Sequence, residues 1–429
     1  MKEPISHTRL LNRIVSCLKI SALAITVMVF SACQESHKKN FKNGIWRATL
    51  KTELGAEIPF NFEVTDSAGK KVMDIINGEE RFRIDEITLT NDSVIIQMPL
   101  FESEIHLAIK GKNLTGHWIK HLADSDAIMK FDAVPDASWR FFNTEVETKF
   151  NITGRWSSTF LSQDKKDTTL AIGEFNQTGS RIAGTFLTTT GDYRFLEGSV
   201  SNNKLYLSCF DGSHAYLFTG KLENDSTIVN GIFYSGLSSV ENWMAIKDEN
   251  AILPDAYSLT ALKSGYEKLA FSFPNLDGEK VSLSDPKFEG KVVVVQFFGS
   301  WCPNCMDETA YLAPFYKKYR DRGVEVVGLA YERSKDFERS KKNVERMKNR
   351  LGVTYDMLIT GYTNDKEEVT ESLPMLSEFV AFPTTILIDK TGKVRKIHTG
   401  FSGPGTGKHY TEFVKEFEKN INDLLAENK

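Results

Sequence analysis

The chain has 429 residues and a formal net charge of -4 at pH 7, and charged residues make up 26% of it. This length exceeds one ordinary domain, so about two or three globular units are expected. The slight acidity gives no reason to expect nucleic acid as a partner.

The N-terminal segment has the pattern of an export signal. Basic residues precede an apolar run over residues 20–30, and the small residues Ser31 and Ala32 follow it. The run is about half as long as the roughly twenty residues that cross a bilayer, so a permanent transmembrane helix is the weaker alternative. We therefore predict a lipoprotein-type signal peptide over residues 1–32.

Phe30-Ser31-Ala32-Cys33 resembles the lipobox of bacterial lipoproteins, with Phe30 where that family usually has an aliphatic residue. The resemblance implies cleavage before Cys33 and several acyl chains on this cysteine, which together give stable anchoring. Residues 33–43 are then a polar tether, and the folded part lies on the periplasmic side of a bacterial cell membrane, inner or outer. Secretion without a lipid is the alternative.

Short alternating strands separated by Gly, Asn and Asp fill residues 44–250, which predicts a mostly antiparallel all-β region. The sequences at 44–46 and 154–156 share a Gly-x-Trp pattern, which gives a repeat period of about 110 residues. Two related modules, over 44–135 and 150–250, or one larger sandwich or barrel fit the pattern. No reaction is assigned to this region.

The five cysteines do not form a disulfide scaffold. Cys17 leaves with the signal peptide, and the lipid blocks Cys33. Cys209 lies in a strand-like run, where a lone cysteine behaves as a small apolar core residue. Cys302 and Cys305 are too close in sequence to join distant segments. Their spacing therefore indicates chemistry.

After a linker over residues 251–266, the chain adopts a βαβ rhythm, and residues 267–429 are predicted to form an α/β domain. The nearly all-apolar run 291–298 indicates a central strand covered on both faces. An apolar stripe at i, i+3, i+4 and i+7 follows from Leu312, so the cysteine pair opens a helix. The other expected elements are a strand at 324–331, a helix at 335–351, a hairpin of 384–389 with 394–401, and a last helix through Tyr410 to Leu424.

Trp301-Cys302-Pro303-Asn304-Cys305, followed later by Phe382-Pro383-Thr384, resembles the thioredoxin superfamily, specifically its TlpA/ResA-like exported branch. The resemblance covers about residues 267–429 and includes an extra hairpin near residues 273–283. It implies a thioredoxin-like fold, a redox-active disulfide between the two cysteines, and a cis peptide bond at Pro383. It also implies that Trp301, Phe382 and Pro383 bind the substrate segment.

A cysteine in the first turn of a helix faces unpaired backbone N–H groups, which favour its thiolate. Cys302, the more exposed position, is the predicted nucleophile, and Cys305 resolves the mixed disulfide. Cytosolic thioredoxins carry a buried acid where this chain has Gln296, whereas Glu308 matches the acid of the ResA-like branch. Glu308 either relays a proton to Cys305, if it is buried, or is an exposed carboxylate that favours the helix dipole.

The same residues disfavour other chemistries. A zinc site needs further ligands, c-type haem attachment needs a His where Met306 stands, and a peroxiredoxin needs upstream residues that Val295 and Gly299 replace. We therefore expect no metal and no cofactor. The chain is predicted to be a thiol-disulfide oxidoreductase that reduces or isomerises disulfides of exported proteins. Its predicted electron donor is a membrane thiol reductant. The alternatives are a binding or scaffold lipoprotein whose β region is the working part, or a peroxiredoxin-like peroxidase.

Overall fold

The computed structural model describes residues 41–144 and 148–427. The expected signal peptide and the lipid attachment site, Cys33, lie outside the described residues. Within these two ranges, no helix has both the length and the apolar character needed to cross a membrane. The expected tether overlaps the folded region at its end, because Phe41 is buried and its ring lies 5.9 Å from that of Trp46.

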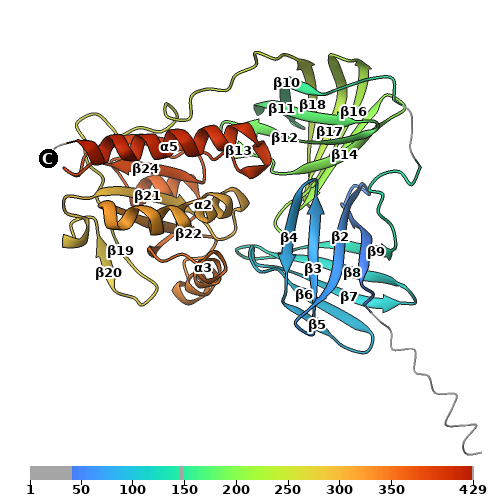
Figure 1. Cartoon of the computed structure of the whole chain (residues 1–429), viewed down its shortest axis with the longest axis horizontal. Coiled ribbons are helices and arrows are strands. Elements are labelled where there is room, and N and C mark those ends of the chain that lie inside the picture. The colour runs from blue at the N-terminus through green and yellow to red at the C-terminus, as the bar shows by residue number, and fades with distance from the viewer. Residues whose placement is uncertain (1–40, 145–147, 428–429) are drawn as a thin grey trace, which may run out of the picture. The chain divides into compact units, whose positions relative to one another are not determined.

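The first β-sheet is antiparallel, has nine strands, and runs in the order β4-β3-β2-β1-β9-β8-β7-β6-β5 (Figure 1, blue to cyan). Its first strand pairs with its last. Inward and outward side chains alternate along strands such as β1 and β7, whereas residues 58–62 of β2 are all buried. Its strands are β1 (Gly44–Lys51), β2 (Glu57–Ser67), β3 (Lys70–Asn77), β4 (Glu80–Ile84), β5 (Ile87–Leu89), β6 (Ser93–Gln97), β7 (Ser103–Lys110), β8 (Asn113–His121) and β9 (Asp126–Pro135).

The second sheet also has nine strands, and a pairing of β11 with β12 closes it into a β-barrel (Figure 1, green). An aromatic cluster that includes Phe160, Phe186 and Phe218 fills its interior. Its strands are β10 (Gly154–Ser162), β11 (Thr168–Thr178), β12 (Arg181–Thr188), β13 (Gly191–Asp192), β14 (Leu196–Ser201), β15 (Lys204–Phe210), β16 (Ala215–Asn224), β17 (Thr227–Ser235) and β18 (Ser239–Lys247).

The two sheets are structural repeats of each other. In both, the first strand pairs with the last, as β1 does with β9 and β10 with β18. The indole N–H of Trp46 donates to the carbonyl of Lys42 at 2.9 Å, and that of Trp156 donates to the carbonyl of Ile152 at 2.8 Å. Both tryptophans are buried, and they are separated by the repeat period found in the sequence. Of the two arrangements left open by the sequence, the structure therefore has two related modules.

The C-terminal domain is built on a five-stranded sheet in the order β23-β22-β21-β24-β25. The first three strands are parallel to one another and the last two are antiparallel to their neighbours. Every side chain of β21 is buried, as expected of a central strand covered on both faces. The strands are β21 (Val292–Phe298), β22 (Val324–Glu332), β23 (Asp356–Thr363), β24 (Thr384–Ile388) and β25 (Val394–Thr399).

Helices and a small hairpin complete this domain (Figure 1, yellow to red). The hairpin, the first long helix and the last helix agree with the sequence-based expectation. β23 and α4 were not predicted, and both fall in the segment between the expected helix and the expected hairpin. The elements are β19 (Ser272–Pro274), β20 (Lys280–Ser282), α2 (Pro303–Tyr319), α3 (Phe337–Leu351), α4 (Lys366–Ser372), α5 (Lys408–Ala426) and the 3₁₀ turns Pro286–Phe288, Arg320–Arg322 and Pro404–Thr406.

The segment expected to be a linker is fixed to the C-terminal domain. Lys263 donates its backbone N–H to Met375, and Ala261 accepts one from Ser377, at 2.8 Å each. The backbone carbonyl of Ala256 accepts from Thr399 at 3.1 Å. The chain therefore joins this domain about ten residues earlier than its sequence indicates.

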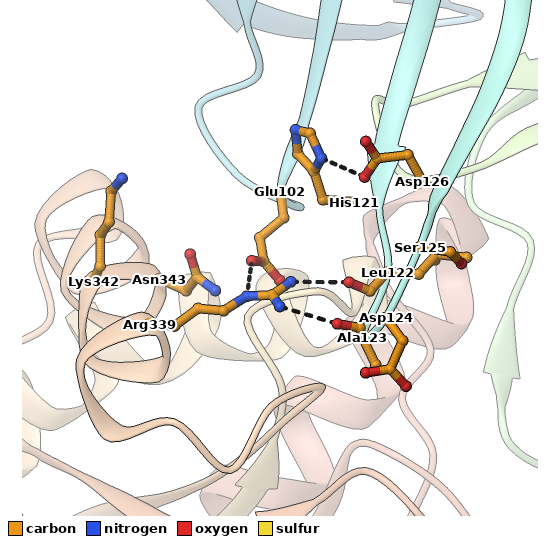
Figure 2. Close-up of a pocket in the computed structure, with 10 residues that line it drawn as sticks. All are labelled: Glu102, His121, Leu122, Ala123, Asp124, Ser125, Asp126, Arg339, Lys342 and Asn343. Carbon is orange, nitrogen blue, oxygen red and sulfur yellow. Dashed lines mark hydrogen bonds and ion pairs between the residues drawn. The ribbon is translucent and has the colours of Figure 1, made fainter.

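The described residues 41–144 and 148–427 pack as one compact unit. Arg339 of α3 makes one of the contacts between the C-terminal domain and the first β-sheet (Figure 2). Its guanidinium is 3.0 Å from the carboxylate of Glu102 and donates to the carbonyls of Leu122 at 3.0 Å and Ala123 at 3.2 Å. This fork of donors meets acceptors on two turns of the sheet, the one before β7 and the one between β8 and β9.

Candidate active site

Cys302 and Cys305 form a disulfide at the start of α2, with their Cα atoms 5.2 Å apart. Cys302 is the N-cap residue, and its sulfur accepts the backbone N–H of Cys305 at 3.2 Å. Pro303 occupies the first helical position, where its missing N–H costs nothing. Cys302 is 6% exposed and Cys305 is fully buried, so an attacking thiol meets Cys302 first.

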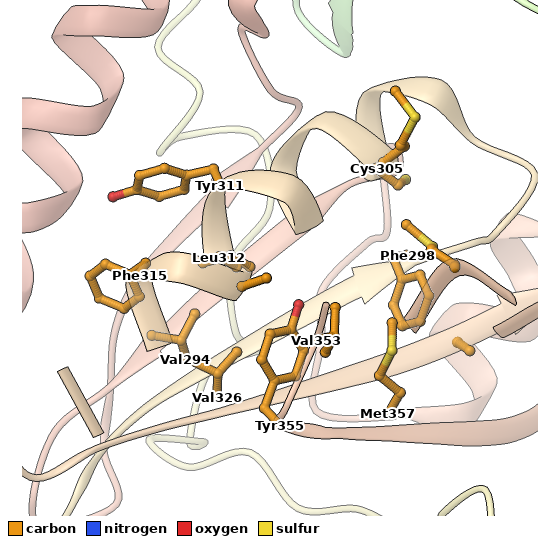
Figure 3. Close-up of a cluster of buried hydrophobic side chains, with 14 of the residues drawn as sticks. Val294, Phe298, Cys305, Tyr311, Leu312, Phe315, Val326, Val353, Tyr355 and Met357 are labelled. Atoms are coloured by element: carbon orange, nitrogen blue, oxygen red, sulfur yellow. The ribbon is translucent and has the colours of Figure 1, made fainter. Parts of the chain in front are cut away.

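The strand before the motif and the helix after it are anchored in one apolar core. Leu312 and Phe315 of α2 lie on the side that faces Val294 of β21 and Val326 of β22 (Figure 3). All four side chains are buried. This packing fixes the point where β21 ends and α2 begins, and so fixes the position of the disulfide.

Glu308 lies one helical turn beyond Cys305 and is buried. Its carboxylate accepts hydrogen bonds from the Gln296 side-chain amide at 2.8 Å and from the Thr385 hydroxyl at 2.7 Å. Burial raises the pKa of Glu308 to about 7. The alternative of an exposed first-turn carboxylate is therefore wrong, whereas the proton relay stays a prediction. Gln296, which replaces the acid of cytosolic thioredoxins, orients this carboxylate.

A second buried acid supports the loop before the disulfide. Glu332, the last residue of β22, accepts the backbone N–H of Ser300 at 2.7 Å and its hydroxyl at 2.6 Å. Burial raises the pKa of Glu332 to about 7. This residue was not predicted from the sequence. The only sequence signal is a carboxylate at the C-terminal end of an apolar parallel strand, where functional side chains often lie.

Aromatic rings flank the disulfide. The rings of Trp301 and Phe382 meet edge to face with centroids 5.6 Å apart. The indole N–H of Trp301 donates to the carbonyl of Tyr331 at 2.9 Å. The Phe382–Pro383 peptide bond is cis, which confirms the expectation. The sequence-predicted residues Trp301, Cys302 and Phe382 thus line one cavity.

The β-barrel forms the opposite wall of that cavity, which has a volume of about 300 Å³. Ser213 donates its hydroxyl to the carbonyl of Trp301 at 3.2 Å, and Asn304 donates its amide to the carbonyl of Asp192 at 3.2 Å. Lining side chains from the barrel include Thr188, His214 and Tyr216. No pattern in the sequence indicated that the β region reaches the disulfide.

Arg194, which follows β13, joins three parts of the chain at the first turn of α2. Its buried guanidinium pairs with Glu80 of the first β-sheet and Asp307 of α2, and it lies 3.5 Å from Asp211. It also donates to the carbonyl of Pro303 at 3.3 Å. Burial opposes the charge, but these carboxylates raise the pKa of Arg194 well above its ordinary value. A charged group this deeply buried requires compensating carboxylates, although the Nε atom of Arg194 has no hydrogen-bond partner.

Over the residues that the structure describes, no group of three or more His, Cys, Asp or Glu side chains is arranged to hold a metal ion.

The Redoxin family model matches residues 263–412. The thiol-disulfide oxidoreductase ResA of Geobacillus thermodenitrificans is 31% identical over 156 residues, which cover 36% of this chain and 80% of the relative. The thioredoxin-like protein YneN of Bacillus subtilis is 30% identical over 139 residues, covering 32% of this chain and 73% of the relative. A thiol:disulfide interchange protein of Chlorobium tepidum, solved as a crystal structure, has 21% identity and a TM-score of 0.29, covering 39% of this chain and all of its own (100%). The likeness to ResA, together with the disulfide at the start of α2, assigns the C-terminal domain. The chain therefore belongs to the ResA-like thiol-disulfide oxidoreductases of the thioredoxin superfamily.

Proposed function

We propose that this oxidoreductase is anchored by a lipid on Cys33 to the periplasmic side of a bacterial membrane, where it reduces or isomerises disulfides of exported proteins. The N-terminal export pattern and the lipobox-like Phe30-Ser31-Ala32-Cys33 support the location. The Cys302–Cys305 disulfide, of which Cys302 is the more accessible sulfur, supports the chemistry.

The reaction uses the two cysteines in turn. The Cys302 thiolate attacks one sulfur of a partner's disulfide, that S–S bond breaks, and a mixed disulfide forms. Cys305 then loses its proton and attacks the Cys302 sulfur, which releases the second partner thiol. Two electrons and two protons pass from the dithiol to the partner, and the Cys302–Cys305 disulfide remains. A membrane thiol reductant of the dithiol class restores the dithiol.

The observation that carries this proposal is the buried Glu308 beside the resolving cysteine. A carboxylate whose pKa is raised to about 7 can accept a proton at neutral pH and return it, as a general acid–base group requires. The hydrogen bonds that it accepts from Gln296 and Thr385 hold the carboxylate in place. Glu308 is thus suited to take the proton of Cys305 during resolution.

The reduction potential of the pair tests the direction of electron flow. The soluble protein is equilibrated in dithiothreitol or glutathione buffers, and the free thiols are alkylated and resolved by gel shift. A potential near about -250 mV or lower supports a reductant, whereas a value near about -120 mV indicates a disulfide-donating oxidant and contradicts the proposal. The Cys302→Ser variant is the control, since it cannot form the pair.

The location has its own test. The N-terminal peptide of the wild-type protein is expected to begin at Cys33 and to carry the mass of attached acyl chains, and the Cys33→Ala variant is expected to lack this mass. An unmodified Cys33 in a membrane-bound protein would contradict the lipid anchor.

A binding role of the β region is the second candidate, and the contact between the β-barrel and the first turn of α2 favours it. A Cys302→Ser, Cys305→Ser double variant separates the two functions in cells. Full function of that variant would mean that the β region is the working part.

A further inference from the structure

The cavity beside the disulfide is shared by two parts of the chain. Trp301, Cys302 and Phe382 line it from the C-terminal domain, and His214 and Tyr216 line it from the β-barrel. The hydrogen bond from Ser213 to the carbonyl of Trp301 joins the residue before His214 to the residue before Cys302. His214 and Cys302, the attacking cysteine, therefore line the same cavity.

His214 is held in a fixed orientation. Its ring nitrogen Nδ1 lies 3.1 Å from the carboxylate of Asp211, and its ring stacks on Tyr216 with centroids 4.7 Å apart. Asp211 also accepts the backbone N–H of His214 at 2.6 Å and that of Ser213 at 2.8 Å. Because a carboxylate accepts the Nδ1 hydrogen, the lone pair of the ring is on Nε2.

We propose that the His214 imidazole accepts the proton of the Cys302 thiol and returns it to the sulfur that leaves the partner's disulfide. A cysteine whose base is oriented by a third group is a recurring way to activate this nucleophile. The β-barrel thereby supplies the proton acceptor for the attacking cysteine, while Glu308 serves the resolving cysteine from inside the C-terminal domain. The inference deepens the proposed function and rests on it.

The step balances without a further reagent. His214 takes the thiol proton, the Cys302 thiolate forms a bond to one sulfur of the partner, and the partner's S–S bond breaks. The departing thiolate takes the proton back from the imidazolium. The mixed disulfide and a neutral His214 remain, so the residue is ready for the next turnover.

The charges around His214 favour a neutral ring before the reaction. Burial lowers the pKa of His214 and outweighs the opposing effect of Asp211. Burial alone would raise the pKa of Asp211, but His214 and Arg194 lower it, so its carboxylate stays charged. The charged and titratable groups near the ring, from the elements packed against it, are Asp211, Arg194, Lys120 of β8, Tyr193, Tyr216, Asp192 and Cys302.

In the reduced protein, the pH dependence of the alkylation rate reports the protonation state of the Cys302 thiol. Iodoacetamide is added between pH 5 and 10, and mass spectrometry of the peptide gives the rate at Cys302. We expect the His214→Gln variant to raise the midpoint of this profile by about one pH unit, which is about tenfold slower alkylation at pH 7. The matched control is His121→Gln, because His121 also pairs with a carboxylate, Asp126 at 2.7 Å, but does not line the cavity.

An unshifted midpoint in folded His214→Gln protein, judged by circular dichroism, overturns the inference. If that variant does not fold, histidine NMR of the wild-type protein replaces it. The pKa of His214 is then expected to be higher in the reduced protein than in the disulfide form, because a Cys302 thiolate stabilises the imidazolium, and equal values overturn the inference. Neither readout depends on the direction of electron flow or on the partners. If the Cys302–Cys305 pair titrates normally but the pH profile of Cys302 alkylation is unshifted in His214→Gln, only the role of His214 is rejected.

Discussion

Replacing Glu308 by glutamine removes a buried ionisable group while it keeps the size of the side chain. In the folded protein, burial raises the pKa of Glu308 from an ordinary 4.5 to about 7. The folded state therefore binds a proton more tightly than the unfolded state does between these values. The stability from this group is complete below about pH 4.5 and is lost as the pH rises through about 7.

A pKa rise of this size corresponds to about 3 kcal/mol of unfolding free energy above pH 7. The substituted glutamine side chain cannot ionise, so the free energy of unfolding of Glu308→Gln, relative to wild type, should increase by up to about 3 kcal/mol between pH 5 and pH 8. A pH-independent cost of about 1 kcal/mol accompanies the change, because the new amide has one acceptor oxygen where the carboxylate accepts from both Gln296 and Thr385. The contribution of Glu332 is common to both proteins and cancels in the difference.

Urea unfolding of the oxidised proteins at pH 5, 6, 7 and 8 measures this difference. Glu338→Gln is the matched control, because Glu338 lies in the first turn of α3 and is exposed. Its difference from wild type should not vary with pH. The same Glu308→Gln protein should resolve mixed disulfides at a rate whose dependence on pH near 7 is lost. A stability difference that stays constant with pH would refute the reasoning about burial, and an unchanged rate profile would remove the proton relay.

Two further predictions concern the β-barrel. The Arg194→Met variant should lose about 3–5 kcal/mol of unfolding free energy, because it leaves buried carboxylates, including Asp307, without their cation. Urea unfolding tests this, with Arg181→Met as the control because the Arg181 side chain is 80% exposed. A loss below about 1 kcal/mol in Arg194→Met would contradict the prediction. Cys209 is fully buried, and burial raises the pKa of its thiol well above its ordinary value. Iodoacetamide should therefore modify Cys302 in the reduced native protein and leave Cys209 unmodified until urea is added. Equal labelling of the two thiols without urea would show that the barrel core opens.

The periodicity of apolar residues along the sequence was enough to predict the helices and strands whose buried faces form a clear local pattern. The apolar run at 291–298 became the central strand β21, and the stripe from Leu312 became the buried face of α2. β23 was missed because its buried part is a short apolar run, which does not distinguish a strand from a helix. α4 was missed because it is short and has one buried residue, Val369, so it has no apolar periodicity.

The candidate site divides in the same way. Short motifs and their resemblance to the thioredoxin superfamily were enough to point to the dithiol, the cis-proline loop and Glu308. The burial of Glu308 could be seen only in the folded chain, since it depends on Gln296 and Thr385 from two other strands. The same holds for Arg194 and His214, which folding brings beside the start of α2. The carboxylates of Glu80 and Asp307, which pair with Arg194, lie on other elements, and no local pattern records contacts between segments a hundred residues apart. His214 pairs locally with Asp211, but its place at the cavity beside Cys302 also depends on the fold.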